Sequence, residues 1–314
     1  MLKQSLIIAS IFAVNAFAGE HLHSVKNYEL AGVMKNHIHA KNSFMTGYST
    51  QYTSMSGLYN QTETEAENTY MMVSEKMAMQ MHMLDLMYGV TDKFNIAVMP
   101  QFMSMDMKHF HVDKMSHETH EVSGVGDTKI SGIYQIAKPI IGSIGVSLPT
   151  GSISNQTGGN QGAYMMQTGT GSYELLPSLT FTEKFHEINF GIQTNASIKL
   201  NDNAHNYRFG NSYNFTAWAG KDFNKNLGSH LRVDYINVGK IQGTDLNLDT
   251  TKSVMNNPVL QFREITTVLI GGNLYMNNGL KFLIEAGVPI YQNLGQGMLK
   301  NSYSIHLSVR KSFN

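Results

Sequence analysis

A regular alternation of apolar and polar residues constrains this chain more than any other feature of its sequence. It runs through the C-terminal two-thirds in stretches of nine to twelve residues, as in 187–200, 280–290 and 303–313. In the first of these, Ile188, Phe190 and Ile192 alternate with Asn189, Gly191 and Gln193. Successive side chains of a strand point to opposite faces, so this period of two predicts strands with one apolar and one polar face.

The alternation and the turn signals between its stretches predict twelve antiparallel strands. We place them at 43–53, 70–88, 94–107, 126–136, 140–149, 171–182, 187–200, 208–221, 228–239, 263–276, 279–291 and 301–313. Short turns separate five pairs of strands, at 89–93, 137–139, 182–186, 222–226 and 277–278. The longer loops fall near 54–69, 108–125, 150–170, 201–207, 240–262 and 292–300.

A soluble β-sandwich would also alternate, so other features must decide between the two architectures. The strands approach the roughly 9–11 residues that a tilted strand needs to cross a bilayer. Their number is even, and short turns alternate with long loops, as in outer-membrane barrels. Phe313 next to the C-terminus resembles the sorting signal of such proteins, although Asn314 follows it. The predicted fold class is therefore all-β, a transmembrane antiparallel up-and-down β-barrel of about twelve strands over 43–314.

The first eighteen residues have the features of a signal peptide cleaved near Ala18. Lys3 precedes a short apolar run, and Ala16-Phe17-Ala18 has the small residues of a cleavage site. A membrane anchor is the alternative, but the run is shorter than the roughly 20 residues of a spanning helix. The expected location is the bacterial outer membrane, with outer-membrane lipid and the barrel-assembly machinery as partners. Residues 19–42 would form either a plug in the lumen or a periplasmic segment.

Composition excludes several classes of function. The formal net charge is zero, which gives no reason to expect a nucleic-acid partner. The chain has no Cys, so disulfides, thiolate metal sites and cysteine nucleophiles are absent. It also has no G-x-S-x-G nucleophile motif, and the sequence predicts no enzyme and no catalytic residue.

Methionine and histidine are concentrated near the N-terminus, where fifteen of the 21 Met lie between Met34 and Met115. Within two neighbouring predicted strands, the alternation places a ladder of Met on the lumen face of each. The candidate metal ligands are Met77, Met79, Met81, Met83, Met99, Met103, Met105 and Met107, with His109, His111, His117 and His120 in the following loop. Thioethers bind Cu(I) and imidazole binds Cu(II) or Zn, so a copper ion is the candidate metal, and the sequence requires no cofactor. The alternative is that Met only packs and His is solvated.

Charged residues on the polar faces of the strands are expected to line the lumen. They include Glu174, Arg232, Asp234, Lys281, Glu285 and Arg310. The last two predicted strands are neighbours, so Glu285 is expected to pair with His306 or Arg310. Such charges either tune ion selectivity or form structural networks that fill a narrow barrel.

Three short motifs together resemble the outer-membrane barrel family named for the MetA pathway of phenol degradation. They are Gly124-Val125-Gly126-Asp127, Val146-Ser147-Leu148-Pro149-Thr150-Gly151 and Gly169-Thr170-Gly171-Ser172-Tyr173. The stretch Ala31-Gly32-Val33-Met34-Lys35-Asn36-His37-Ile38-His39 resembles a Met- and His-rich subset that accompanies copper handling. The resemblance implies a pore with an uptake or efflux role and carries no catalytic residues.

The expected function is thus an outer-membrane channel or transporter for a small solute, with copper or another soft metal ion as one candidate. The alternative is a non-conducting outer-membrane protein that binds and sequesters metal.

Overall fold

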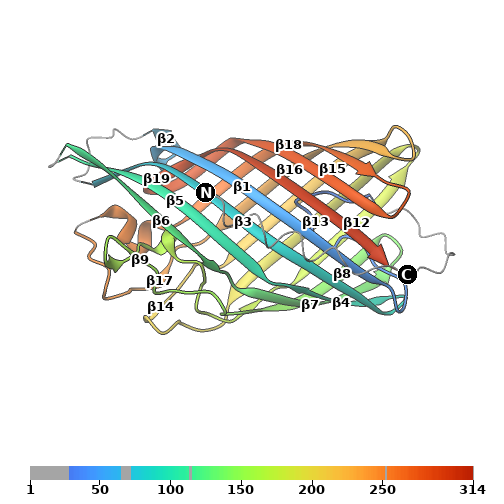
Figure 1. The fold of residues 1–314 in the computed structure, drawn as a ribbon, viewed down its shortest axis with the longest axis horizontal. Helices are drawn as coiled ribbons and strands as arrows, with labels where there is room; N and C mark the ends of the chain where they lie inside the picture. Colours follow the sequence, from blue (N-terminus) through green and yellow to red (C-terminus); the bar gives the residue numbers. More distant parts are fainter. Residues whose placement is uncertain (1–27, 65–71, 113–114, 252, 314) are drawn as a thin grey trace.

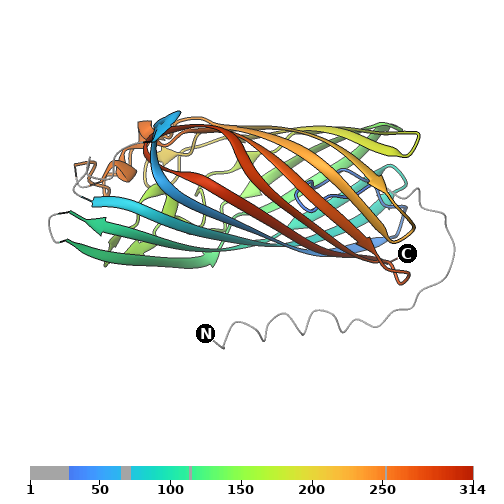
Figure 2. The same ribbon diagram turned by 90° about the horizontal axis from the view of Figure 1, so that it is seen from above.

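The protein is described here by a computed structural model, which covers residues 28–64, 72–112, 115–251 and 253–313. The predicted signal peptide, 1–18, lies outside the described residues. A single antiparallel sheet closes on itself, because β1 (Phe44–Gln61) pairs with both β3 (Met72–Thr91) and β19 (Leu280–Phe313). The result is the barrel seen from two sides in Figures 1 and 2.

The wall of the barrel is completed by the remaining long strands and by β11, which continues into β12. They are β4 (Phe94–Met99), β5 (Gln101–His111), β6 (Ser116–Val125), β7 (Thr128–Ala137), β8 (Ile140–Leu148), β11 (Glu174–Leu175), β12 (Ser178–Phe185), β13 (Ile188–Lys199), β15 (Ser212–Asp222), β16 (Leu227–Val238) and β18 (Arg263–Tyr275). Short elements lie in the long loops: β2 (Glu63–Thr64), β9 (Gln156–Thr157), β10 (Asn160–Gln161), β14 (Tyr207–Arg208), β17 (Gln242–Gly243) and the 3₁₀ turns η2 (Tyr164–Met166), η3 (Val254–Asn256) and η4 (Pro258–Leu260).

No helix among the described residues is long and apolar enough to cross a bilayer.

Several named strands are parts of one crossing of the wall. β4 and β5 are separated by Pro100, which lacks a backbone N–H for the ladder, yet both pair with β3. β19 is 34 residues long; its first half pairs with β18 and its second half with β1. A closed ring in which all neighbours are antiparallel needs an even number of crossings, so β19 must double back. Over the described residues this gives twelve crossings, and the predicted fold class is confirmed.

Three predicted loops are shorter than expected, and most of the loop predicted at 108–125 is wrong. β5 continues to His111 and β6 begins at Ser116, so this region forms a hairpin of paired strands. β1 likewise continues to Gln61, and β19 runs through 292–300. These segments do not alternate regularly, so a period of two does not identify them as strands. Backbone hydrogen bonds with the neighbouring strand hold them without that pattern.

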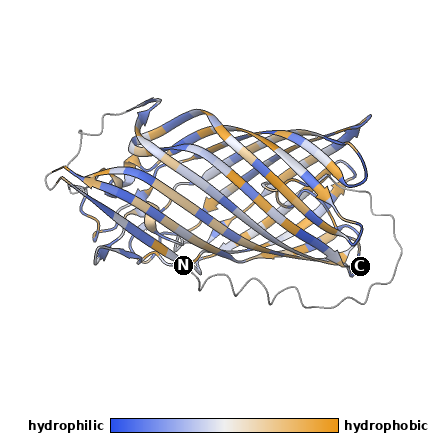
Figure 3. Cartoon of the chain, turned by 45° about the horizontal axis from the view of Figure 1, so that its top comes forward, coloured by the Kyte–Doolittle hydropathy of each residue, from blue (hydrophilic) through white to orange (hydrophobic). Residues whose placement is uncertain are grey.

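Along much of the wall the outward face is apolar and the inward face is polar, the reverse of a soluble protein, although the Met of β3 and β5 face inward. On β13, Phe190 and Ile192 are exposed whereas Asn189 and Gln193 are buried. Figure 3 shows the same alternation of apolar and polar residues along the neighbouring strands. An exposed apolar surface that extends over many strands is typical of contact with lipid.

The two ends of the barrel differ. The short turns and the C-terminus lie at one end, and the long loops lie at the other (Figure 1). Residues 28–42 fold into the lumen at the short-turn end (Figure 2), where Glu29, Leu30 and Val33 are buried. Residues 28–42 are the described part of the predicted segment 19–42.

Candidate functional site in the barrel lumen

The N-terminal segment, residues 28–42, is fastened to charged groups of the wall. The Glu29 carboxylate accepts a hydrogen bond from Arg310 Nη1 at 3.2 Å and forms an ion pair with Lys281. Arg310 Nη2 also donates to the Leu30 carbonyl at 3.2 Å. The backbone N–H of Gly32 donates to Glu285 Oε2 at 2.7 Å. Three of the predicted lumen charges therefore hold this segment in place.

An apolar contact supports the same docking. Tyr28, Leu30 and Val33 pack with Trp218 of β15, and the Tyr28 hydroxyl donates to the Ser229 carbonyl at 2.6 Å. The Tyr28 ring lies so close to the wall that a Cβ on Gly220 would be 2.4 Å from it. Glycine at this position is therefore what allows the ring to pack against the strand.

Two histidines of the segment, His37 and His39, have neutral rings. His37 Nε2 and His39 Nε2 are 3.1 Å apart, and His37 Nδ1 is 2.9 Å from Asn36 Oδ1. Burial lowers the pKa of His37 to about 3, against the opposing effect of Glu29. Burial also lowers the pKa of His39 to about 4. Both rings are neutral at pH 7 in this position.

The predicted pairing of Glu285 with His306 or Arg310 is wrong. Its Oε1 lies 2.8 Å from Arg232 Nε and 3.0 Å from His230 Nε2, both on β16. Glu285 reaches over β18 because Gly271 stands between it and His230 in register. A Cβ on Gly271 would be 2.3 Å from His230 Nε2, so a larger residue would block this contact.

The other predicted charges also form local pairs inside the barrel. Asp234 Oδ1 lies 2.9 Å from Arg232 Nη1, and Glu174 Oε1 lies 2.9 Å from Lys199 Nζ. All six of the predicted lumen charges form ionic contacts, in which Asp234 and Lys281 stay partly exposed and their partners are buried.

The predicted Met ladders face each other across β3 and β5. The register pairs Met77 with Met107, Met79 with Met105 and Met81 with Met103, while Met83 lies opposite Gln101. Met77, Met105 and Met107 are buried in an apolar cluster with Met55, Met166, Met255 and Leu299. This packing agrees with the apolar role that the sequence left open for them. Met99 is apart from the ladder pairs, opposite Lys129 of β7.

The four candidate histidines lie on the hairpin of β5 and β6 at the long-loop end. Glu118 lies between two of them, with Oε2 3.1 Å from His111 Nε2 and Oε1 3.0 Å from His120 Nε2. The buried His109 ring is centred 5.1 Å from that of His120. His117 points to Glu75 instead, at 3.0 Å. In the part of the chain that the structure describes, no group of three or more His, Asp and Glu is arranged to hold a metal ion.

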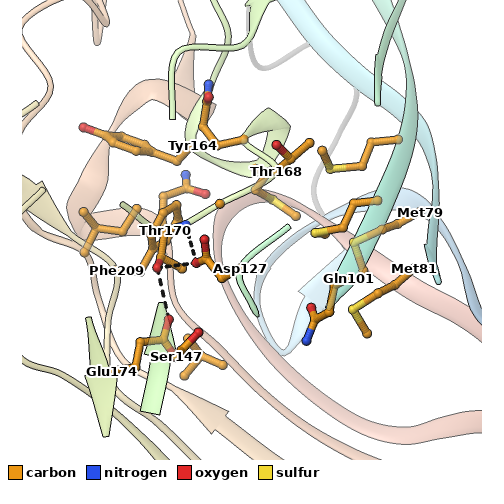
Figure 4. Close-up of a pocket in the computed structure, with 18 of the residues that line it drawn as sticks. Met79, Met81, Gln101, Asp127, Ser147, Tyr164, Thr168, Thr170, Glu174 and Phe209 are labelled. Carbon is orange, nitrogen blue, oxygen red and sulfur yellow. Dashed lines mark hydrogen bonds between the residues drawn. The ribbon is translucent and has the colours of Figure 1, made fainter. Parts of the chain in front are cut away.

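Between the N-terminal segment and the long loops, the lumen holds a cavity of about 360 Å³. Met79, Met81, Met103 and Met105 line it on one side, and Figure 4 shows Met79 and Met81 facing Asp127, Glu174 and Phe209 across open space. A second cavity of about 140 Å³ is lined by Arg232, Asp234 and His306. Met79 and Arg263 line both cavities, so the two are adjacent.

The loop 149–173 forms part of the wall of the larger cavity and is fastened by Asp127. That carboxylate accepts from the backbone N–H of Gly151 at 2.9 Å, and from Thr170 N–H at 2.8 Å and Oγ1 at 2.7 Å. The three motifs quoted for the family resemblance thus meet at one carboxylate. Asp127 was missed as a site residue, although its place in the first motif was a signal that could have identified it.

No family model and no curated protein matches this chain. Among solved structures, an outer membrane channel from Pseudomonas putida F1 superposes with a TM-score of 0.61 at 11% identity, over 90% of this chain and 99% of that one. The Ralstonia pickettii toluene transporter TbuX gives 0.46 at 9% identity, over 88% of this chain and 90% of its own. The first likeness shows the barrel fold, and the second, below 0.5, establishes nothing further.

Proposed function

We propose that this chain is an outer-membrane channel for a small solute. The observation that carries the proposal is the cavity of about 360 Å³ that remains inside a closed barrel with an apolar exterior. Eight-stranded barrels are filled by side chains and sixteen-stranded porins are open. A twelve-stranded wall with an internal cavity fits a narrow, regulated path between these two.

Two chain segments border this path, which sets a condition on transport. Residues 28–42 lie in the lumen at the short-turn end, and loop 149–173 is fastened in the wall of the cavity by Asp127. A solute that crosses the barrel lengthwise must therefore pass one or both of these segments. The charged contacts of Glu29 and Asp127 are the groups that would resist their displacement.

The location and partners follow from the same proposal. The chain would be exported by the signal peptide at 1–18, inserted by the barrel-assembly machinery and surrounded by outer-membrane lipid. Membership of the MetA-pathway barrel family and the absence of enzymatic activity belong to this proposal as well.

Single-channel recording of the refolded mature protein in planar bilayers tests the channel. We expect discrete, small conductance steps that are interrupted by closures. The Asp127→Asn variant serves as an internal comparison, because loosening the loop should lengthen the open periods. A silent bilayer with correctly folded protein, judged by heat-modifiable gel mobility, contradicts the proposal. Recovery of the native protein in the soluble periplasm contradicts the membrane location.

Metal sequestration is a second candidate, favoured by the side chains around Glu118. His111 and His120 share this carboxylate beside the His109 ring, and a metal ion could take the place of the carboxylate between the imidazoles. Copper titration of the refolded protein tests it, with the His111→Gln/His120→Gln variant as comparison and the His186→Gln variant as matched control. Binding weaker than micromolar, or binding that the double variant retains, contradicts this candidate.

A further inference from the structure

Arg263 differs from the other arginines of the lumen because no carboxylate among the described residues pairs with it. Its side chain lines both cavities and is half-buried. Among the described residues it has no hydrogen-bond or ion-pair partner, whereas Arg232 and Arg310 are each held by a carboxylate. A guanidinium has five N–H donors, and removing it from bulk water without a counter-ion is unfavourable. An anion in the cavity would supply the negative charge and the hydrogen-bond acceptors that this guanidinium lacks.

A second cation lines the larger cavity from the opposite wall. Lys129 lies on β7, which is directly across the strand order from β18. Two acids line the same cavity: Glu174 pairs with Lys199, and Asp127 accepts only from neutral N–H and O–H groups of the loop and so keeps its negative charge. In the described part of the chain, Lys129 forms no ion pair of its own. Asp127 therefore balances the charge of Lys129, and Lys199 balances that of Glu174. This leaves the Arg263 guanidinium as the positive charge of the described lining without a counter-charge.

The rest of the lining is largely apolar. It includes the four Met of the ladders and the side chains of Phe209, Ile241 and Phe262. Thioethers make favourable contacts with aromatic rings and adapt to irregular shapes. The volume of about 360 Å³ lies within the usual range for sites that hold small organic molecules.

We propose that this cavity binds a small organic anion with an apolar body. The carboxylate is held by the Arg263 guanidinium, and the apolar body lies against Met79, Met81 and Met103. Guanidinium groups bind carboxylates through two parallel hydrogen bonds, which orients the ligand as well as attracting it. The proposal rests on the channel function in placing this cavity on the path of the solute.

The same charge argues against a metal cation as the occupant of this cavity. The uncompensated Arg263 guanidinium shares the cavity with the Met side chains and repels a copper ion at short range. The thioethers here are therefore assigned to the apolar body of the ligand.

Calorimetric titration of the refolded mature barrel in detergent at pH 7 tests the assignment, with benzoate and its uncharged analogue benzamide as probes. We expect benzoate to bind about tenfold more tightly than benzamide, the size of one charge-assisted contact. Arg263→Gln should remove this preference and Arg263→Lys should keep most of it. Arg208→Gln is the matched control, because Arg208 is exposed and pairs with Asp202 outside the cavity. Equal affinities for the two probes, or an unchanged preference in Arg263→Gln, would overturn the proposal.

Competition by acetate, an anion without a large apolar body, shows whether the cavity recognises the apolar body as well as the charge. If the Met side chains hold the apolar body, acetate competes with benzoate poorly, and Met81→Gln weakens benzoate while leaving acetate unchanged. Equal competition by acetate would overturn the apolar part of the proposal. Binding in detergent requires no conduction, so a silent barrel that prefers benzoate defeats only the channel. A conducting barrel without the preference defeats only the anion site.

Discussion

The Arg310 guanidinium donates a hydrogen bond to the Glu29 carboxylate over 3.2 Å, and both side chains are 1% exposed. The contact joins the last strand of the barrel to the segment that precedes the first. Because the pair is buried, removing one partner leaves the other charge uncompensated, which typically costs about 3–5 kcal/mol. A few charged residues therefore contribute much of the free energy that docks the N-terminal segment in the lumen.

Glu29→Gln should loosen the N-terminal segment from the lumen. The change leaves Arg310 and Lys281 without their carboxylate, so we expect a wider or more frequently open pore. Trp218, the one tryptophan of the sequence, packs on this segment, so acrylamide should quench its fluorescence more strongly in the variant. Glu187→Gln removes an exposed pair with Lys221 and should change neither readout. Unaltered quenching and conductance in Glu29→Gln would show that the ion pair does not hold the segment.

Docking of the N-terminal segment should weaken as the pH falls below about 6.5. In the docked state the pKa of His37 is about 3 and that of His39 about 4, whereas a solvated histidine has a pKa near 6.5. The released state therefore binds protons more readily, so docking is fully favoured above pH 6.5 and loses stability toward pH 4. Trp218 quenching followed against pH measures this.

The His37→Gln/His39→Gln variant provides the comparison for the pH dependence. It should lose most of the change in quenching between pH 6.5 and 4. A wild-type signal that stays flat over this range, or a variant with the same midpoint as the wild type, would exclude the two histidines as its cause.

Asp127→Asn should free the loop 149–173 from the wall of the cavity. The amide cannot accept all the hydrogen bonds that Gly151 and Thr170 donate, and each charge-assisted bond contributes about 1.5–3 kcal/mol. We expect faster proteolysis within the loop in folded protein and longer open periods. Asp202→Asn, at an exposed site, is the control. A loop that remains as resistant as in the wild type would mean that other contacts hold it.

Met107 distinguishes packing from metal binding in the Met ladders. Met107→Leu conserves volume and should cost less than about 1.5 kcal/mol, whereas Met107→Ala should cost about 2–5 kcal/mol. Urea unfolding in detergent measures both, and Cu(I) titration of Met107→Leu shows whether the thioether is a ligand. If Met107→Leu is as stable as the wild type yet loses tight Cu(I) binding, the ladder has a role as a ligand set in addition to packing.

The sequence alone predicted most strands of the barrel wall, because the alternation shows which face of a strand each residue occupies. The inward position of Gln193, the outward position of Ile192 and the inward faces of Met77 and Met107 all follow from a period of two, whereas the register of β3 and β5 sets these two Met opposite each other. The same signal fails at 116–125, where both faces of β6 are polar and only pairing with β5 defines the strand.

The contacts within the lumen were decided by tertiary structure. Glu285 bonds to Arg232 instead of Arg310 because the small Gly271 lets it reach over the neighbouring strand, and Arg310 is taken by Glu29. Sequence spacing fixes the face on which a charge lies, but closure of the barrel and entry of residues 28–42 fix which charge it meets. That is also why Arg263 could be recognised as unpartnered among the described residues only after the ring of strands had closed around it.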